Sequence, residues 1–409
     1  MVASTQELDS RRLRIVSVVP SLARNTGGPA VTLVQGTRAM GDSVQRVLYA
    51  TDAAQPAASR PFQRLSADDL PEGAIDVPIR VFRTRPPYQF GFSPGLWTAL
   101  RRDIPKADLV TVHSVNLFPQ YAAFTVALRA GVPYIVTPHG ALDPWLARNS
   151  PLHKRINNAL WQRRMLGNAS AIHFTTEAEA ELAGEMTSAA AHVVVPNGVE
   201  LARFAEARSG ASFRNSRLQG YTGLVVLFLG RIARKKGIDL LIRAFARVAE
   251  SRDCMLVVAG PDDENLTSDL LATAGAVGVR NRVRFVGPVY GEDQLEALGA
   301  ADVWALTSHT ENFGNAVVEA MAAGCPVLVS TEVNLAAQIG AAGAGVVTGL
   351  AVEDIAVALG SLLDDSHRRA ELGSSGRAFA RRFDWSIVAP QLVEVFREMA
   401  KRRPRRNGS

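Results

Sequence analysis

DVWALTSHTENFGNAVVEAMAAGCPVLVS, residues 302–330, consists of an apolar run, a segment of helical period and a second apolar run. A strand with one face in water would alternate apolar and polar residues, and neither of these apolar runs does so. Strands of this kind are buried on both faces, as in a parallel sheet that helices cover on each side. The stretch therefore predicts a βαβ unit with the polar residues 308–314 at the carboxyl end of its first strand.

The same rhythm of strands and helices extends outward from this stretch over most of the chain. It breaks between Asn197 and Gly220, where the sequence is polar, rich in Gly, Ser and Arg, and has no strand run, so we expect the linker between two domains there. We therefore expect an α/β fold of two doubly wound, Rossmann-like domains without internal duplication, with ligands bound in the cleft between them, at the carboxyl ends of the strands. The expected parts are an N-terminal domain at 11–198 joined by a C-terminal helix at 384–402, a C-terminal domain at 199–383, and a basic tail at 403–409.

Composition and charge exclude several classes of protein. With 47% hydrophobic and 21% charged residues among 409, the chain is not intrinsically disordered. The net charge is +6, but five cations lie in the last nine residues, so the body is nearly neutral and we expect no nucleic-acid partner. Cys254 and Cys325 lie beside apolar runs and read as core residues. The polar start lacks the pattern of a signal peptide, so we expect a cytoplasmic protein.

Two glutamates, Glu311 and Glu319, flank the start of the helix predicted within 302–330. Glu311 precedes Phe313 and Gly314, where backbone N–H groups at a helix start can face an anion. In this position Glu311 can orient sugar hydroxyls and Glu319 can accept hydrogen bonds from a ribose diol. The E-x7-E spacing itself recurs at Glu177 and Glu185, where no glycine lies close to the first glutamate, and the alternative is a helix with ordinary polar residues.

A second cluster of charge follows the strand predicted at 223–230. Arg231 and Lys236 come after this strand and before a helix, a placement suited to a diphosphate. The alternative is a solvated basic turn.

Two further positions follow strands of the first half. Gly27 and Gly28 precede a helix that opens with Pro29, so this loop fits either contact with a phosphate or sugar, or a tight turn alone. His139, in TPHG, leaves its strand toward the expected cleft, whereas His173 reads as a core histidine and His309 as a loop cap.

In combination, these segments resemble the family-4-type retaining glycosyltransferases of the GT-B fold, the glycosyl transferases group 1. The resemblance rests on the GG loop, TPHG, VVPNGVELARF, GRIARKKG and ENFGNAVVEAMAAGCPV. It implies that Arg231 and Lys236 bind the donor diphosphate, that Phe313, Gly314 and Asn315 line the phosphates, and that Glu319 holds the ribose. It also implies that Glu311 and His139 contact the transferred sugar. Asn312 departs from many relatives, which carry a small residue there.

The resemblance implies a retaining transferase that moves a hexose-type sugar from a UDP- or GDP-sugar to a glycan or lipid-linked acceptor, in the synthesis of cell-surface polysaccharide or glycolipid. No two aspartates are separated by one residue, so the Asp-x-Asp that holds a metal on the diphosphate is absent. We therefore expect no metal and no cofactor, with the leaving diphosphate stabilised by cations and a helix start. Two alternatives remain, a nucleotide-sugar epimerase or hydrolase and a catalytically silent sugar-binding scaffold.

A basic segment between Pro144 and Thr176 contains no acid and mixes cations with Trp and Leu over 148–164. Together with the basic tail it predicts contact with an anionic membrane surface, and hence a peripheral location at the inner face of the membrane. The alternative is a solvated helix that covers the sheet.

Overall fold

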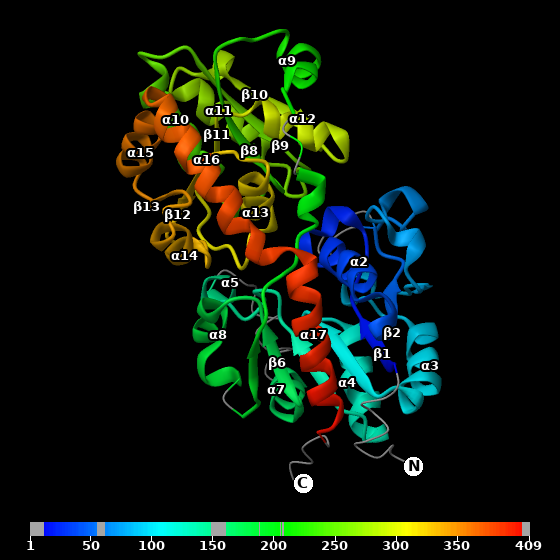
Figure 1. Ribbon diagram of the computed structural model, residues 1–409. Coiled ribbons are helices and arrows are strands. Elements are labelled where there is room, and N and C mark those ends of the chain that lie inside the picture. Colours follow the sequence, from blue (N-terminus) through cyan, green and yellow to red (C-terminus); the bar gives the residue numbers. More distant parts are fainter. Residues whose placement is uncertain are drawn as a thin grey trace. The chain divides into compact units, whose positions relative to one another are not determined.

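The computed structural model describes residues 12–54, 62–148, 161–187, 189–204, 206 and 208–402. Within these ranges the chain forms two compact units. The first unit contains the described residues up to Gly198 and those from Trp385 onward, and the second contains Val199–Asp384 (Figure 1). The C-terminal helix therefore belongs to the first unit, although the whole second unit separates it in sequence from the rest.

The first unit is built on a seven-stranded sheet in the order β3-β2-β1-β4-β5-β6-β7, in which every pairing is parallel. Its strands are β1 (Leu13–Val18), β2 (Val44–Thr51), β3 (Ile79–Phe82), β4 (Leu109–His113), β5 (Tyr134–Thr137), β6 (Ala171–Phe174) and β7 (His192–Val194). Its helices are α2 (Gly28–Met40), α3 (Pro94–Asp103), α4 (Phe118–Ala130), α5 (Pro144–Arg148), α7 (Arg163–Asn168), α8 (Glu177–Ala183) and α17 (Trp385–Ala400).

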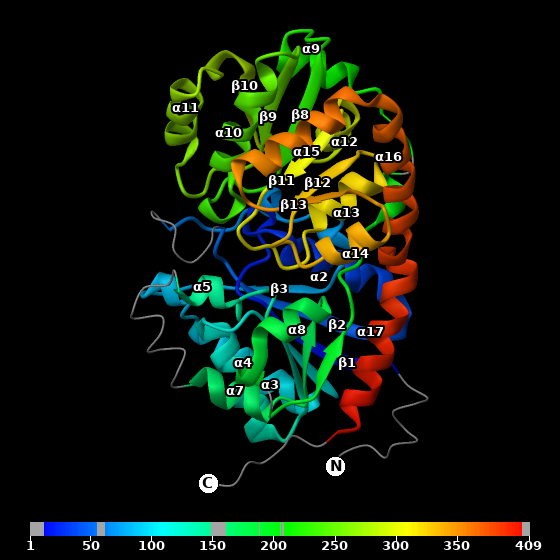
Figure 2. The same ribbon diagram turned by 90° about the vertical axis from the view of Figure 1, so that its left-hand side faces the viewer.

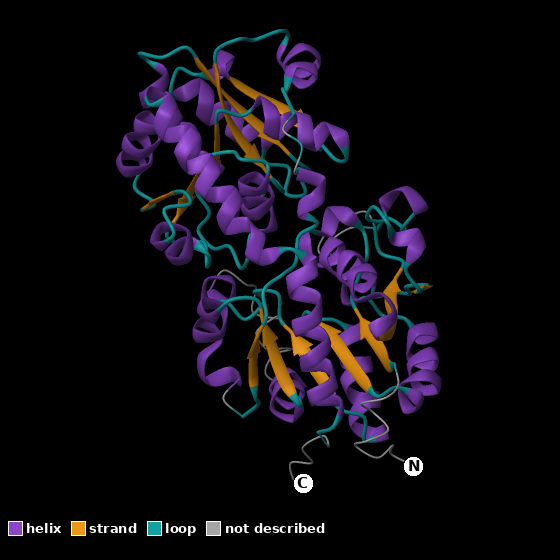
Figure 3. Ribbon diagram, viewed as in Figure 1, coloured by secondary structure: helices purple, strands orange, loops and turns teal. Residues whose placement is uncertain are grey.

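Helices cover both faces of this sheet because successive strand residues point to opposite sides. Ile15, Leu109 and Ile135 pack in one cluster with the apolar side chains of α17, and α2 packs against α17 beside them. Residues of the other parity pack with α3, α4 and α7. Figure 1 shows α17 running along the sheet, and Figure 3 shows the same strands in orange.

The second unit is built on a six-stranded parallel sheet in the order β10-β9-β8-β11-β12-β13 (Figure 2). Its strands are β8 (Leu224–Leu229), β9 (Cys254–Ala259), β10 (Val283–Gly287), β11 (Val303–Leu306), β12 (Val327–Ser330) and β13 (Val346–Thr348). Its helices are α9 (Ala211–Leu218), α10 (Ile238–Ala249), α11 (Thr267–Ala276), α12 (Glu292–Ala300), α13 (Asn315–Ala322), α14 (Ala336–Ala341), α15 (Val352–Asp364) and α16 (Ser366–Ala380).

The strand order reverses once in each sheet, between β1 and β4 in the first and between β8 and β11 in the second. The loops that leave two such strands diverge to opposite faces, and the crevice between them at the carboxyl edge is where open α/β sheets bind ligands. The candidate residues lie at these edges: Arg231 follows β8 and Glu311 follows β11, whereas the GG loop follows β1.

Two parts of the fold differ from the sequence expectations. The segment expected as a linker is not a free connection: from Val199 onward its described residues belong to the second unit and include the 3-10 helix η9 (Leu201–Phe204) and α9. Arg214 of α9 explains this order, because its guanidinium donates to the carbonyls of Gly223 and Ala300 at 2.8 and 2.7 Å. Strand β3 was not predicted, because an edge strand without a buried run carries no clear pattern.

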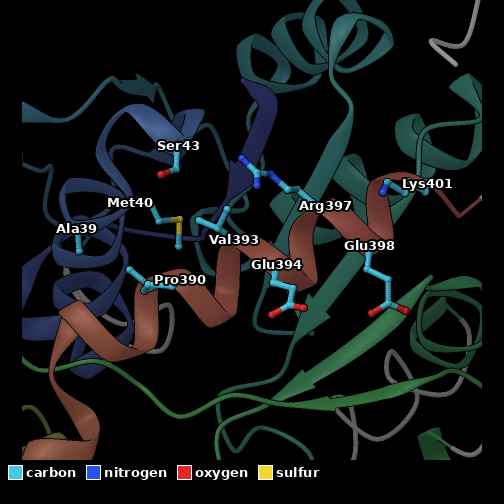
Figure 4. A pocket seen from close by; sticks show the side chains of 10 residues that line it. Ala39, Met40, Ser43, Pro390, Val393, Glu394, Arg397, Glu398 and Lys401 are labelled. Atoms are coloured by element: carbon cyan, nitrogen blue, oxygen red, sulfur yellow. The ribbon is translucent and has the colours of Figure 1, made fainter. Parts of the chain in front are cut away.

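A groove on the first unit runs between the end of α2 and α17 (Figure 4). Ser43, one of its lining residues, directly precedes β2, so the groove lies at the amino edge of the sheet, away from the strand ends. The residues that line the groove are Ala39, Met40, Ser43, Ala389, Pro390, Val393, Glu394, Arg397, Glu398 and Lys401.

None of the described helices is long and apolar enough to cross a membrane.

Candidate active site

In the second unit, the loop after β8 is fastened to the loop after β11. The hydroxyl of Thr307 donates to the carbonyl of Gly237 at 2.8 Å, and the backbone N–H of His309 donates to the carbonyl of Lys235 at 2.7 Å. Gly237 has a φ of 60°, and a Cβ there would lie 2.1 Å from the carbonyl oxygen of Thr307. Glycine is therefore required where the two loops meet. This contact places Lys236 beside the segment that carries Glu311.

Lys236 and Glu311 form an ion pair in which each side chain is only 12% exposed. The backbone of Glu311 is itself held, because its N–H donates to Glu332 at 3.1 Å and its carbonyl accepts from Asn334 at 3.0 Å. Burial would raise the pKa of Glu311, but the charges of Lys236, Lys235 and Arg231 outweigh it, so that pKa lies below its ordinary value. Glu311 is therefore ionised at neutral pH within a basic cluster.

Arg231 belongs to the same cluster, since its charge acts on Glu311. Its guanidinium lies 3.8 Å from a carboxylate oxygen of Asp263, in the loop after β9. Burial raises the pKa of Asp263, and Arg231 partly opposes this effect. The cations are thus balanced by carboxylates that an incoming anion can replace.

Helix α13 begins where this cluster ends. Gly314 caps the helix with a φ of 76°, and Asn315 is its first residue. Phe313 is 2% exposed and packs edge-on against Phe383 with ring centroids 5.3 Å apart, so its side chain belongs to the core. The first N–H groups of a helix carry the positive end of its dipole. This start is suited to an anion.

Glu319 lies on α13, one turn or more beyond Gly314. The side-chain amide of Gln294, on α12, donates to one of its carboxylate oxygens at 2.7 Å. Burial raises the pKa of Glu319, although Arg203 and Gln294 oppose this effect. No pattern in the sequence points to Gln294, since only the fold brings α12 beside α13.

In the first unit, the GG loop has the predicted order of strand, loop and helix. The 3-10 helix η1 (Arg24–Thr26) follows β1, and Gly27 has a φ of 108°. Helix α2 begins at Gly28 with a proline in its first turn. The loop lies at the carboxyl edge of the sheet, beside the point where the strand order reverses.

His139 follows β5 in a left-handed backbone conformation with a φ of 54°, which is uncommon for residues other than glycine. Next to it, the N–H of Gly140 donates to a carboxylate oxygen of Glu179 at 2.7 Å. The other oxygen of Glu179 accepts from the N–H and the hydroxyl of Thr175, both at 2.8 Å. Glu179 is buried at the start of α8 and thus holds the turn that carries His139.

The ring of His139 stacks on that of His113, the last residue of β4, and the two rings share a hydrogen bond of 3.0 Å. His173 is buried, and Thr137 and the carbonyl of Val195 hold its nitrogens, so it is a core histidine as predicted. Neither His113 nor Glu179 was predicted, because their contacts with the turn join strands that are distant in sequence. Such contacts leave no local pattern.

Most of the basic segments lie outside the described residues. The tail 403–409 and the stretch 149–160 are not described, and the predicted contact with a membrane stays a prediction.

In a comparison with known protein families, each half of the chain matches one family. The family described as "Glycosyl transferase 4-like domain" matches residues 27–198, and "Glycosyl transferases group 1" matches residues 212–379. A D-inositol 3-phosphate glycosyltransferase of Actinosynnema mirum is 30% identical over 75% of this chain and 78% of its own length. The chain is a group 1 glycosyltransferase. Membership in a glycosyltransferase family supports an enzyme that transfers sugars. The two alternatives, a catalytically silent scaffold and an epimerase or hydrolase, are therefore not retained.

Other relatives cover this glycosyltransferase almost completely. A D-inositol 3-phosphate glycosyltransferase of Stackebrandtia nassauensis is 28% identical over 99% of the chain and 96% of its own length. Among solved structures, Anabaena HepE in complex with UDP and glucose has a TM-score of 0.75 and 21% identity, and covers 95% of this chain and 100% of its own. The predicted fold of two Rossmann-like domains is thereby confirmed as that of GT-B glycosyltransferases.

Proposed function

We propose that this glycosyltransferase transfers a hexose-type sugar from a UDP- or GDP-sugar to a glycan or lipid-linked acceptor, with retention of the anomeric configuration and without a metal. One observation carries the proposal. The ion pair of Lys236 and Glu311, with Arg231 close by, stands where the strand order of the second sheet reverses. A cluster of cations with a carboxylate at this edge suits a sugar diphosphate.

The chemistry follows from the charges. As the bond from the anomeric carbon to the diphosphate oxygen breaks, the hydroxyl oxygen of the acceptor forms the new bond to that carbon from the same face. Negative charge grows on the leaving phosphate, and one of its oxygens takes the proton of the acceptor hydroxyl. Arg231, Lys236 and the first N–H groups of α13 stabilise that charge without moving, as preorganised groups do. Glu311 exchanges part of its contact with Lys236 for a hydroxyl of the sugar. Glu319 accepts from the ribose diol.

The names and ligands of related proteins narrow the choice of donors and acceptors to test. HepE, which shares the fold, was solved with UDP and glucose, and this favours a UDP-sugar as the first donor to test. Relatives named D-inositol 3-phosphate glycosyltransferase match most of the chain, and this favours a phosphorylated polyol as a second candidate acceptor.

The experiment is a screen of donors followed by acceptors. Binding of UDP, GDP and their hexose derivatives is measured by calorimetry, and transfer is then assayed with a lipid-linked glycan and with D-inositol 3-phosphate. We expect one nucleoside diphosphate to bind at least tenfold more tightly than the other. Failure of every nucleoside diphosphate to bind contradicts the proposal.

Transfer should also persist in excess EDTA, because cations of the chain carry out the stabilisation that a metal provides in other transferases. Initial rates with and without EDTA, in protein purified in its presence, test this. Loss of turnover that magnesium or manganese restores contradicts the metal-free mechanism.

A further inference from the structure

A layer of polar side chains lies on one face of the first sheet, where hydrophobic packing would be expected. Ser17, Arg46, Thr111 and His113 are each at most 6% exposed. They share this face with the apolar residues that pack under α17, and the guanidinium of Arg46 lies 5.7 Å from the ring centroid of Phe396 on that helix. Burial of a guanidinium costs free energy unless hydrogen bonds or an opposite charge compensate for the lost water. Within the described part of the chain, Arg46 forms no ion pair.

The hydrogen bonds of this layer lead to His139. Arg46 donates from Nε to the hydroxyl of Ser17 at 2.7 Å, and its Nη2 lies 3.4 Å from Nε2 of His113. The hydroxyl of Thr111 lies 3.0 Å from the same nitrogen. On the other side of the ring, Nδ1 of His113 lies 3.0 Å from Nε2 of His139.

These contacts determine where the protons lie. A guanidinium has donors and no acceptor, so in its 3.4 Å contact with Arg46 the Nε2 of His113 is the acceptor. The hydroxyls of Ser17 and Thr111 are 2.7 Å apart, and in this arrangement Ser17 donates to Thr111, which leaves the proton of Thr111 for the same Nε2. A neutral imidazole that accepts at one nitrogen carries its proton on the other, so Nδ1 of His113 donates to Nε2 of His139. His139 then carries its own proton on Nδ1, which makes no hydrogen bond within the described residues.

Both imidazoles are neutral in this arrangement. Burial lowers the pKa of His139 to about 3, with a smaller contribution from His173. Burial also lowers the pKa of His113 well below its ordinary value, and His139, Arg46 and His173 act in the same direction. Among the described residues, Glu179 forms its hydrogen bond with the turn through the backbone N–H of Gly140 alone. Each ring therefore holds one proton at neutral pH.

We propose that Arg46, acting through His113, fixes His139 in the tautomer that carries its proton on Nδ1, so that His139 donates a hydrogen bond to a ligand oxygen at the carboxyl end of β5. Arg46 and His113 are thus positioning residues. Because Nε2 of His139 is already engaged, this nitrogen does not act as a base. The inference rests on the proposed function only for the ligand, which is a hydroxyl oxygen of the transferred sugar.

The proton positions can be observed directly in the full chain. Long-range ¹H–¹⁵N spectra of protein labelled with ¹⁵N-histidine distinguish protonated from unprotonated ring nitrogens, and His139→Gln identifies the signals of His139. We expect Nδ1 of His139 to be protonated and Nε2 to be unprotonated at pH 7. A proton on Nε2 of His139, or on both nitrogens, overturns the proposal.

Two substitutions of equal size separate the roles of His113. His113→Asn keeps a donor near the position of Nδ1, so His139 should keep its tautomer. His113→Asp offers only an acceptor, so His139 should move its proton to Nε2. His173→Asn is the matched control, because it removes a buried histidine of the same face that does not contact Nε2 of His139. A change of tautomer in the control, or none in His113→Asp, contradicts the role given to His113.

Rates then separate this inference from the proposed function. We expect kcat/KM for transfer to fall on the order of 10- to 100-fold in His113→Asp and to stay mostly intact in His113→Asn. If the tautomers are as proposed and His113→Asp transfers like the wild type, the hydrogen-bond relay stands and the contact of His139 with the sugar is wrong. If His113→Asp does not fold, the wild-type and His113→Asn spectra still decide.

Discussion

The ion pair of Lys236 and Glu311 bears on the site both without a ligand and with the proposed diphosphate bound. Each is mostly buried, and among the nearby cations Lys236 has the largest effect on Glu311. In the proposed function, a bound diphosphate is a second anionic partner for Lys236, and Glu311 competes with the phosphate for it. We therefore expect the carboxylate of Glu311 to oppose binding of the diphosphate and to contact the sugar.

This competition predicts the behaviour of Glu311→Gln. Removal of the negative charge should raise the affinity for the nucleoside diphosphate a few-fold, because a like charge close to the anion is lost. Turnover should fall about tenfold or more, because a contact that strengthens as the sugar departs is weakened. Calorimetry and initial rates measure the two effects. A tenfold loss of affinity would show that Glu311 helps to hold the nucleotide.

Glu179 makes a separate prediction, with a control on the same helix. Its two oxygens accept from three donors, so Glu179→Gln leaves an amide group where acceptors are needed. We expect a loss of stability of about 1–3 kcal/mol and a lower kcat, because the turn of His139 is released. Glu177→Gln, at an exposed position of α8, should change stability by less than about 0.5 kcal/mol. Urea unfolding and initial rates of both variants test this, and equal losses in the two contradict it.

At the scale of elements, the loop after β8 positions the cations because it is locked to the loop after β11. Gly237 is the point of contact, with no room for a Cβ beside Thr307. The lock explains how a surface loop can hold Lys236 in a fixed place.

Gly237→Ala should therefore disturb both stability and binding. Gly278→Ala is the matched control, because Gly278 also has a positive φ, 78°, but a Cβ added there would meet no described atom within 4 Å. We expect Gly237→Ala to cost about 1–3 kcal/mol more than the control, since only it adds a clash to the backbone strain. Nucleoside diphosphate affinity should fall in Gly237→Ala alone. Equal unfolding free energies in the two variants would mean that the loops separate without cost.

At the scale of the whole molecule, both units repeat one arrangement, a parallel sheet with candidate residues at the edge where its strand order reverses. The sequence predicted this arrangement for two reasons. Buried parallel strands can be recognised because their apolar and polar residues do not alternate. A residue that directly follows such a strand must lie at the carboxyl edge of the sheet. Arg231, Lys236 and Glu311 could therefore be assigned to one edge from their positions alone.

The contacts that support the site could not be predicted in the same way. Arg46 and His113 are 67 residues apart, and Glu179 is 39 residues from Gly140. Each of these pairs forms only after strands have taken their order in the sheet, so no spacing in the chain reveals it. Similarly, the apparent linker is folded because Arg214 binds carbonyls that are near or distant in sequence, at Gly223 and Ala300.

The central claim is that the second unit binds a nucleoside diphosphate through Arg231 and Lys236. The most direct test is the dissociation constant of the preferred nucleoside diphosphate, measured by calorimetry for wild type, Arg231→Ala, Lys236→Ala and the exposed neighbour Arg234→Ala, with the thermal midpoint of each as a check of folding. Loss of a charge-assisted contact of about 1.5–3 kcal/mol predicts weakening of about 10- to 150-fold for the first two variants and little change for the third. Wild-type affinity in folded Arg231→Ala and Lys236→Ala would contradict the account.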